Sequence, residues 1–427
     1  MLDIKLIAEN PDAVKKDLKK RNDAEKLKWV DDAVKKYREY GQLVYDAQKL
    51  KQKRNEVGLE IAKRKREGKD VGALLKEMKN IPKEIENKDK GINVLKQKID
   101  WYLLRLPNIM HESVPVGAGD AGNVETRKVG KVPKFSFKPL DHIDITAKHG
   151  LVDIDRAAKV AGARFYYLKN ELVLLNQALI KFALDFIFKR GYSIFQPPYM
   201  LRKAAINGAI ALSDFEDVIY KVEGEDLYLI GTSEHALLAY HMDEILEGAK
   251  MPLKYAAISP CYRKEAGAHG RDTKGIFRVH QFEKVEQFIF CRPEESWKMH
   301  EELLKNAEDL FRALKIPYRV MNICTGDLGT VAAKKYDIEA WLPGQGQFRE
   351  VVSCSNCTDY QARRANIRFR DNPGDPTRHP HTLNSTLVAT ERALIAILEN
   401  YQQPDGTVAI PEALQPCMNG MRFIGKK

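Results

Sequence analysis

Residues 257–288 bring together arginines, aromatic rings and carboxylates, at spacings that two strands joined by a loop would place on shared faces. Along the second strand, alternation with a period of two separates two faces. One face carries Phe277, Val279, Gln281 and Glu283, and the other carries Arg278, His280, Phe282, Lys284 and Glu286. Arg263 and Glu265, two residues apart, share a face of the first strand.

The face with Arg278 combines three kinds of binding group. The planar fork of an arginine binds phosphate or carboxylate oxygens, an exposed aromatic ring stacks on a base, and a carboxylate binds an ammonium or amino group. For any single Arg-x-Glu pair the alternative is an ordinary hairpin with surface ion pairs, which stabilise a protein very little. The combination within one hairpin favours a nucleotide site.

The stretch YRKEAGAHGRDTKGIFRVHQFEKVEQF resembles motif 2 of the class II aminoacyl-tRNA synthetases, and specifically of the seryl-tRNA synthetase family. GYSIFQPPYM is similar to motif 1 and follows an apolar stretch, ELVLLNQALIKFALDFIFKR, that predicts a helix. HTLNSTLVATERALIAILENYQ resembles motif 3, with Arg392 as its arginine, although Ser385, Leu387 and Ala389 stand where the family favours glycine. GTSEHAL and FREVVSCSNCTDYQARR also resemble family segments, so the resemblance covers essentially the whole chain.

The resemblance implies an ATP site in which Arg263 and Arg392 are the catalytic residues. The implied ATP-binding set is Arg263, Lys264, Glu265, Arg278, Val279, Phe282, Glu350, Val351, Val352, Ser353 and Arg392. In this family Arg263 would bridge the amino-acid carboxylate and the α-phosphate, and Arg392 would hold the γ-phosphate. Arg278 would assist with the phosphates, Phe282 would stack on adenine, and Glu265 would accept a hydrogen bond from the exocyclic amine.

The resemblance also implies a magnesium ion and a serine pocket. Glu350 and Ser353 would hold Mg²⁺ beside the phosphates. The implied serine-binding set is Thr232, Ser233, Glu234, Glu286, Asn384 and Thr386. The carboxylate of Glu286 would bind the ammonium and accept from the hydroxyl, so alanine would lose ~1 to 3 kcal/mol of binding free energy. The alternative for Glu286 is a strand carboxylate paired with Lys284 or Arg263.

The function implied is that of a homodimeric serine–tRNA ligase whose motif 1 unit builds the dimer interface. It would activate L-serine with ATP to seryl-adenylate and transfer serine to the terminal adenosine of tRNA(Ser), with tRNA(Sec) as a further acceptor. An ionised carboxylate needs no general base, so catalysis is expected from positioning and metal-assisted electrostatics. A paralogue that loads a carrier protein usually lacks a basic arm. A silent RNA-binding relative would have lost at least one of five residues that are all present: Arg263, Glu265, Glu286, Glu350 and Arg392.

The composition agrees with an enzyme whose partner is a polyanion. The net charge is +11, and most of it lies in residues 1–112, which favours nucleic acid as the partner. The chain opens without a basic leader followed by an apolar core and has no run of ~18 apolar residues, so we expect a cytoplasmic protein without a membrane span. The six cysteines include one isolated pair, Cys354 and Cys357, so no protein-bound zinc is expected.

The amino-terminal segment has the apolar rhythm of a long antiparallel coiled-coil hairpin. Its seam is Ala33, Tyr37, Tyr40, Val44, Ala47, Leu74, Met78, Ile81, Ile85, Ile92, Leu95, Ile99, Tyr102 and Leu106. Residues 63–72 predict the turn, and a helix of about 38 residues would reach ~57 Å. Pro82 would break the returning helix or begin its continuous part, and Gly91 is a second position at which the helix would be weaker. The residues expected to bind tRNA are Lys49, Lys51, Lys53, Arg54, Lys63, Arg64, Lys65 and Arg66; a solvated helix face is the alternative.

Three parts follow from these patterns. Residues 1–106 are expected to form a tRNA-binding helical arm, residues 107–134 a linker, and residues 135–427 a class II synthetase catalytic domain. The catalytic part has neither a GxGxxG dinucleotide loop nor a P-loop, which argues against a Rossmann fold. The resemblance implies an α+β fold, an antiparallel sheet flanked by helices.

Overall fold

The computed structural model describes residues 1–210, 218–265 and 274–425. It divides into two compact units, Met1–Ile109 and Met110–Lys427. Most of the loop predicted between the two arms of motif 2, residues 266–273, lies outside the described residues.

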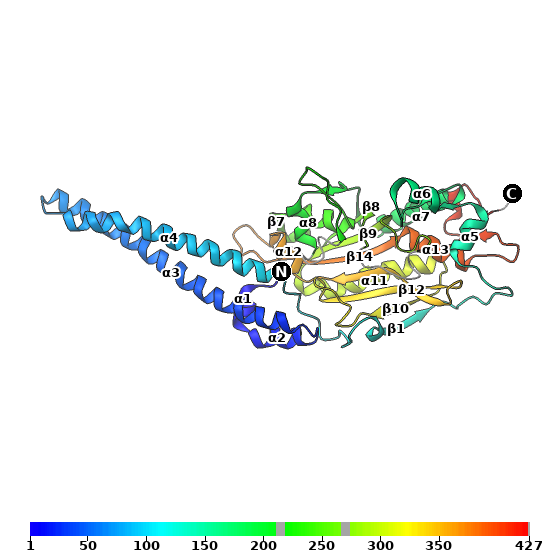
Figure 1. Ribbon diagram of the computed structural model, residues 1–427, viewed down its shortest axis with the longest axis horizontal. Helices are drawn as coiled ribbons and strands as arrows, with labels where there is room; N and C mark the ends of the chain where they lie inside the picture. The colour runs from blue at the N-terminus through cyan, green and yellow to red at the C-terminus, as the bar shows by residue number, and fades with distance from the viewer. Residues whose placement is uncertain (211–217, 266–273, 426–427) are drawn as a thin grey trace. The chain divides into compact units, whose positions relative to one another are not determined.

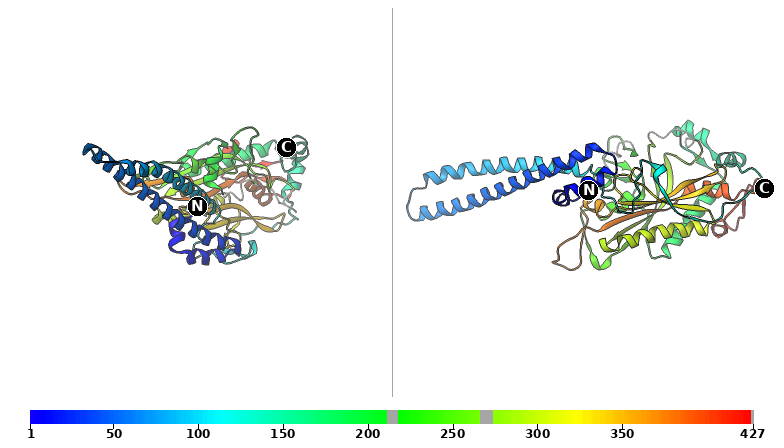
Figure 2. Two further views of the ribbon diagram at one scale, coloured as in Figure 1. Left: turned by 60° about the vertical axis from the view of Figure 1, so that its left-hand side comes forward. Right: turned by 90° about the horizontal axis from the view of Figure 1, so that it is seen from below.

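The first unit is helical, and two of its helices form a long antiparallel hairpin (Figures 1 and 2). Its helices are α1 (Ile4–Glu9), α2 (Pro11–Lys19), α3 (Ala24–Arg66) and α4 (Gly72–Leu103). Ion pairs join the two long helices, with Lys88 Nζ 2.9 Å from Asp46 and Lys51 Nζ 3.2 Å from Asp89. The predicted seam is buried or half-buried along its whole length, so the coiled-coil arm is confirmed.

Three details of the arm differ from the prediction. Helix α3 has 43 residues and continues to Arg66, so the turn is shorter than the predicted residues 63–72. Helix α4 is continuous through Pro82, which neither breaks it nor begins it. Ile81 and Ile85 are buried in one cluster with Val57 of α3, and this packing offsets the lost hydrogen bond and the steric conflict of the proline. At Gly91, a Cβ atom would lie 3.2 Å from Leu43 Cδ1, so the glycine allows close packing.

The second unit is built on an eight-stranded sheet within the described residues, in the order β1-β10-β11-β12-β14-β9-β8-β4. Neighbouring strands are antiparallel except for β4 and β8, which are parallel. The strands are β1 (Val124–Val129), β10 (Tyr318–Asn322), β11 (Lys334–Leu342), β12 (Gln347–Asn356), β14 (His381–Ala389), β9 (Gln281–Cys291), β8 (Leu253–Tyr262) and β4 (Ser193–Phe195). The α+β class with an antiparallel sheet is confirmed.

Three of the helices that contact the sheet belong to its main hydrophobic core (Figure 1). They are α7 (Glu171–Phe188), α11 (Ser296–Ala313) and α13 (Thr390–Asn400). Alternation in β9 places Val285 and Ile289 in the main hydrophobic core and directs Gln287 to α11, where its Nε2 donates to Leu303 O at 3.2 Å. The intervening Lys284 and Glu286 line a cavity instead. The register of one strand therefore separates core from site.

The remaining elements are short. The helices are α5 (His142–His149), α6 (Ile154–Ala161), α8 (Lys203–Ala209), α10 (Ser233–Ala239) and α12 (Tyr360–Arg364), with 3-10 turns η1 (Asp120–Gly122), η2 (Gly248–Lys250), η4 (Pro293–Glu295) and η5 (Gln415–Met418). The paired short strands are β2 (Val152–Asp153) with β3 (Tyr167–Leu168), β5 (Met200–Leu201) with β6 (Tyr228–Leu229), β7 (Ile245–Glu247) with β13 (Arg368–Arg370), and β15 (Val408–Ala409) with β16 (Phe423–Ile424).

Two expectations for this unit need correction. The predicted linker, residues 107–134, contains β1, which pairs with β10 at the edge of the sheet. The strands of motif 2 are also shorter than predicted, because β8 ends at Tyr262 and β9 begins at Gln281. The predicted assignment of Phe277 and Val279 to the opposite face from Arg278 is therefore wrong, and all three line one cavity. Alternation constrains side chains only where the backbone is extended.

Candidate active site

A cavity of about 300 Å³ lies over the central strands of the sheet. Strands β9, β12 and β14, the first turn of α13 and the segments that flank the motif 2 loop form its wall. Its lining is Thr232, Glu234, Arg263, Glu265, Phe277, Arg278, Val279, Phe282, Lys284, Glu286, Glu350, Val351, Ser353, Asn384, Thr386, Ala389, Glu391 and Arg392.

Most of the predicted ATP and serine residues line this cavity, and three do not. Val352 and Ser233 are buried, and Lys264 is partly buried with its backbone N–H bonded to Val218 O at 3.0 Å. The cavity also includes two ionisable residues that the sequence interpretation missed, Lys284 and Glu391. The alternation places Lys284 on the same face as Glu286, and this position is the sequence signal for its place in the cavity.

Arginines gather at one end of the cavity, each held by a short contact. Arg263 Nε donates to Gly231 O at 3.0 Å, and its guanidinium lies 5.2 Å from the ring centroid of Phe282. Arg278 Nη1 lies 2.8 Å from a carboxylate oxygen of Glu265. Because their side chains are already oriented, these cations can meet an anion with little loss of side-chain entropy.

Arg392 completes the cationic end from the first turn of α13. Its Nη1 donates to the backbone oxygen of Glu350 at 3.0 Å and lies 3.3 Å from the carboxylate of the same residue. The guanidinium also lies 4.9 Å from the ring centroid of Phe277, a distance at which a cation and an aromatic face attract. The helix and strand β12 therefore fix Arg392 together.

Buried carboxylates and amides form the other end. Glu234 Oε1 accepts from Gln361 Nε2 at 2.6 Å and from Asn384 Nδ2 at 3.1 Å. Burial and the charge of Glu286 raise the pKa of Glu234 to about 7. Glu286 lies 2.5 Å from Lys284 Nζ, and burial raises its pKa as well. The pairing of Glu286 with Lys284, left open by the sequence, is present, and both side chains face the cavity.

The residues predicted to hold magnesium supply oxygen donors. Glu350 and Ser353 line the cavity from β12, and Ser353 faces Asp337 of β11 in the strand register. Burial and the charge of Glu350 raise the pKa of Asp337. No group of three or more His, Cys, Asp or Glu residues suited to a metal occurs among the described residues. This donor set fits Mg²⁺, which protein sites bind through one or two carboxylates together with substrate phosphates and water.

A second cavity of about 290 Å³ adjoins the first. It shares five lining residues with the first cavity: Thr232, Glu234, Arg263, Ser353 and Asn384. The rest of its lining is mainly apolar or small and includes Ile210, Leu328, Val331 and Ala332. A substrate in the first cavity could therefore be reached from this second side.

The eight predicted tRNA-binding residues are all exposed on α3 of the first unit. Lys63, Arg64, Lys65 and Arg66 form its last helical turn. Some of the eight have partners, as Arg64 does with Glu60 at 2.6 Å. The structure thus places the predicted residues on one solvated segment of the helix. No helix in the described part of the chain is long and apolar enough to cross a membrane.

Comparisons with known proteins agree over nearly the whole chain. A family model for the tRNA synthetase class II core domain (G, H, P, S and T) matches residues 218–401, and one for the seryl-tRNA synthetase N-terminal domain matches residues 1–110. A serine–tRNA ligase of Thermococcus sibiricus is 55% identical, covering 97% of this chain and 96% of the relative.

Solved structures give the same result. The crystal structure of a seryl-tRNA synthetase from Pyrococcus horikoshii complexed with ATP matches with a TM-score of 0.95, 54% identity and 99% coverage of both chains. A cytoplasmic serine–tRNA ligase from Naegleria fowleri in complex with AMP matches with a TM-score of 0.89 and 37% identity, over 99% of this chain and 98% of that one.

The sheet, the three arginines and the matched core define a class II aminoacyl-tRNA synthetase. The match of the amino-terminal domain and the sequence identity over nearly the full length identify one family within that class. The chain belongs to the seryl-tRNA synthetase family. It is therefore an enzyme, an ATP-dependent ligase that joins serine to tRNA.

Proposed function

We propose that the first cavity converts L-serine and ATP to seryl-adenylate and pyrophosphate and then presents the adenylate to tRNA(Ser). The observation that supports this proposal most directly is that one cavity contains both the arginines that would bind the phosphates and the carboxylates that would bind the ammonium. Two anions and one cation must enter together, and each end suits one kind of group.

At the cationic end, Arg263 contacts both the serine carboxylate and the α-phosphate, and Arg392 holds the γ-phosphate. Arg278 adds positive charge along the phosphates, and Lys264, outside the lining, adds it from the position next to Arg263. Adenine stacks on Phe282, which already lies against Arg263, and Glu265 accepts from its amino group. Residues 351 and 352 support this wall through the backbone of β12.

Glu350 and Ser353 are the residues that would hold Mg²⁺ at this end. When bound, the ion neutralises charge that develops on the transferring phosphates. Arg392, which contacts Glu350 by side chain and backbone, orients that carboxylate. Burial raises the pKa of Glu350 and the charges of Arg392 and Lys335 outweigh this effect, so the pKa lies below its usual value and the carboxylate stays ionised at neutral pH.

At the acidic end, the serine ammonium lies between Glu234 and Glu286, and the serine hydroxyl bonds to Glu286. Thr232, Ser233, Asn384 and Thr386 complete the pocket. Thr232 Oγ1 accepts from Glu234 N at 3.3 Å and so fixes the start of α10. Lys284 limits the negative charge of the pocket through its ion pair with Glu286. A pocket built of buried polar groups rejects a ligand that leaves them unpaired.

We propose that residues 1–106 bind tRNA through Lys49, Lys51, Lys53, Arg54 and the basic last turn of α3, and that residues 135–427 catalyse. Backbone and shape recognition of a long variable arm would admit tRNA(Sec) as well as tRNA(Ser). The terminal adenosine would reach the adenylate through the second cavity. The enzyme would work in the cytoplasm, where its six free cysteines stay reduced.

The motif 1 unit, α7 with β4, would form a homodimer interface. Large apolar side chains on it are exposed, with 48% of Leu174, 65% of Phe188 and 40% of Ile194 accessible. Large apolar side chains exposed to this extent favour a contact surface.

Pyrophosphate exchange tests the activation step separately from tRNA. Exchange would be measured with serine, threonine, alanine and cysteine, on the full chain and on a variant with a shortened arm. Since Asp46 and Lys88 meet across the hairpin, residues 48–86 can be replaced by a glycine-rich turn of about four residues.

Serine should support exchange in both proteins, and alanine should be ~5 to 150-fold less effective because it lacks the hydroxyl. Only the full chain should charge tRNA. Charging by the shortened protein would contradict the role of the arm, and exchange with no amino acid would contradict the role of the cavity.

A further inference from the structure

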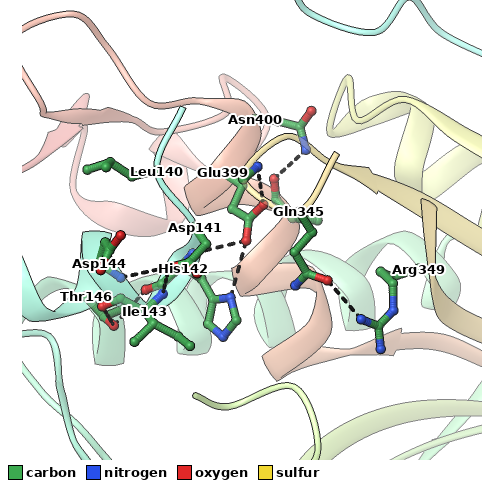
Figure 3. Close-up of polar contacts among 12 residues, drawn as sticks. Leu140, Asp141, His142, Ile143, Asp144, Thr146, Gln345, Arg349, Glu399 and Asn400 are labelled. Carbon is green, nitrogen blue, oxygen red and sulfur yellow. Dashed lines mark hydrogen bonds and ion pairs between the residues drawn. The ribbon is translucent and has the colours of Figure 1, made fainter. Parts of the chain in front are cut away.

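A buried histidine–carboxylate pair lies at the carboxyl end of α13, outside the residues that line the cavity (Figure 3). His142 Nδ1 lies 3.3 Å from Glu399 Oε1, and the backbone N–H of His142 donates to the same oxygen at 3.0 Å. Glu399 is fully buried and His142 is 3% exposed. The other carboxylate oxygen of Glu399 accepts from Gly344 N at 2.8 Å. Glu399 therefore joins the start of α5 to the β11–β12 turn.

The second nitrogen of His142 meets the segment that leads into β9. His142 Nε2 is buried and has no hydrogen-bond partner among the described residues. It occupies the place where a side chain on Gly275 would lie, since an added Cβ would come within 2.2 Å of it. Gly275 has a φ of +73°, which glycine adopts without strain. The imidazole thus packs directly on the backbone two residues before Phe277 and three before Arg278.

The β11–β12 turn supports the same segment from another side. Next to Gly344, Gln345 Oε1 accepts from Arg349 Nη1 at 2.8 Å. The guanidinium of Arg349 lies 4.1 Å from the ring centroid of Phe277, and the same ring contacts Arg392 at 4.9 Å. Two series of contacts therefore connect Glu399 with the segment before β9. One ends on residue 275 and the other on residue 277.

We propose that His142, oriented by Glu399, is a positioning residue for ATP. It fixes residues 274–280, and through them Phe277, Arg278 and Arg392, in the geometry that receives the nucleotide. The serine end lies on β9, β14 and α10, and neither member of the pair is among the described residues that line the cavity. Loss of His142 should therefore weaken ATP use selectively. This inference rests on the proposed ATP role of the cationic end.

The first test compares His142→Asn with His142→Ala in serine-dependent pyrophosphate exchange. Asparagine can still donate to Glu399 but is too short to pack on Gly275. Both variants should raise the KM for ATP by ~10-fold, because small displacements of positioning groups cost up to about 10²-fold in rate. The KM for serine should change by less than about 2-fold. His142→Asn should keep the unfolding temperature closer to that of the unchanged protein.

A double-mutant cycle tests the contact itself. Gly275→Ala should raise the KM for ATP, and this effect should shrink several-fold when His142→Ala removes the clash. Gly150→Ala is the matched control, because Gly150 ends α5 with a φ of +61° and open space around it. It carries the same backbone strain without the contact, so its KM for ATP should not change.

Equal increases in both KM values, or additive effects of the two substitutions, would overturn the positioning role. A fall in unfolding temperature with unchanged kinetics would overturn it too. These results differ from failure of the proposed function, because in that case the unchanged protein itself would show no serine-dependent exchange.

Discussion

The arm and the catalytic unit use charge in opposite ways. In the arm, apolar residues form a narrow seam and the charged residues face solvent, as in the exposed pair of Glu86 and Lys90. In the catalytic unit, Lys284 and Glu286 form an ion pair whose side chains are only 7% and 2% exposed. The first unit carries its excess positive charge on many exposed side chains, whereas the cavity of the second depends on a few that are removed from solvent.

This difference follows from solvation. Water and salt screen exposed charges, so each contributes little and their effects on binding a polyanion accumulate. Buried charges are desolvated, so each depends on its particular partners and shifts its pKa strongly. We therefore expect single substitutions to have large effects in the cavity and small, additive effects on the arm.

The largest expected effect is that of Arg263→Ala. The substitution removes a cation held by Gly231 O and Phe282 at the point where the two substrates meet. Serine-dependent pyrophosphate exchange should fall at least ~10³-fold, a loss typical of removing charge stabilisation from a reaction centre. Arg156→Ala is the control, because Arg156 is 79% exposed and pairs with Asp153 on the surface. If the exchange rate of Arg263→Ala were within a factor of about ten of that of the control, the predicted difference between the units would be wrong.

The sequence predicts most of the cavity because its residues lie on regular elements at motif spacings. Phe282 and Glu286 share a face of β9, and Arg392 follows a strand in the first turn of a helix. The fold class and the coiled-coil arm follow from the same regularities and from the family resemblance. Local pattern and tertiary structure agree at these positions.

What the sequence did not predict depends on contacts between distant segments. Glu391 reaches the cavity through bonds with Glu283 N at 2.7 Å and Tyr166 Oη at 3.2 Å. Phe277 was assigned to the wrong face because the strand begins later than the alternation suggests. Pro82 remains helical because packing against α3 stabilises the helix around it. Tertiary packing overrides local propensity in each case.

The substitution Glu234→Gln tests the comparison through the pH dependence of the free energy of unfolding. The pKa of Glu234 is raised to about 7 from 4.5, so the folded protein keeps a proton that the unfolded chain loses. Stability is therefore lost as pH rises from 4.5 to 7, and the cost reaches on the order of 3 kcal/mol above pH 7. Glutamine retains an oxygen for Gln361 and Asn384 and avoids this cost.

Denaturant unfolding at pH 5 and pH 8 measures this effect. Glu234→Gln should exceed the unchanged protein in free energy of unfolding by more at pH 8 than at pH 5, while the KM for serine rises because a carboxylate facing the ammonium is lost. Glu225→Gln, at an exposed position, should show no such dependence on pH. A stability difference that is equal at both pH values would mean that the carboxyl of Glu234 is solvated like those of the arm.

The smallest expected effect is that of one charge at the end of the arm. Lys65 is exposed in the last turn of α3. Lys65→Gln should leave pyrophosphate exchange unchanged, weaken tRNA binding a few-fold, and reduce the slope of log affinity against log salt by ~0.7 to 0.9. Lys159→Gln, an exposed lysine of α6, is the control and should leave the slope unchanged. A loss of binding greater than about 10²-fold from Lys65 alone would show that the arm depends on one specific contact, as the cavity does, and the contrast between screened and buried charge would not hold.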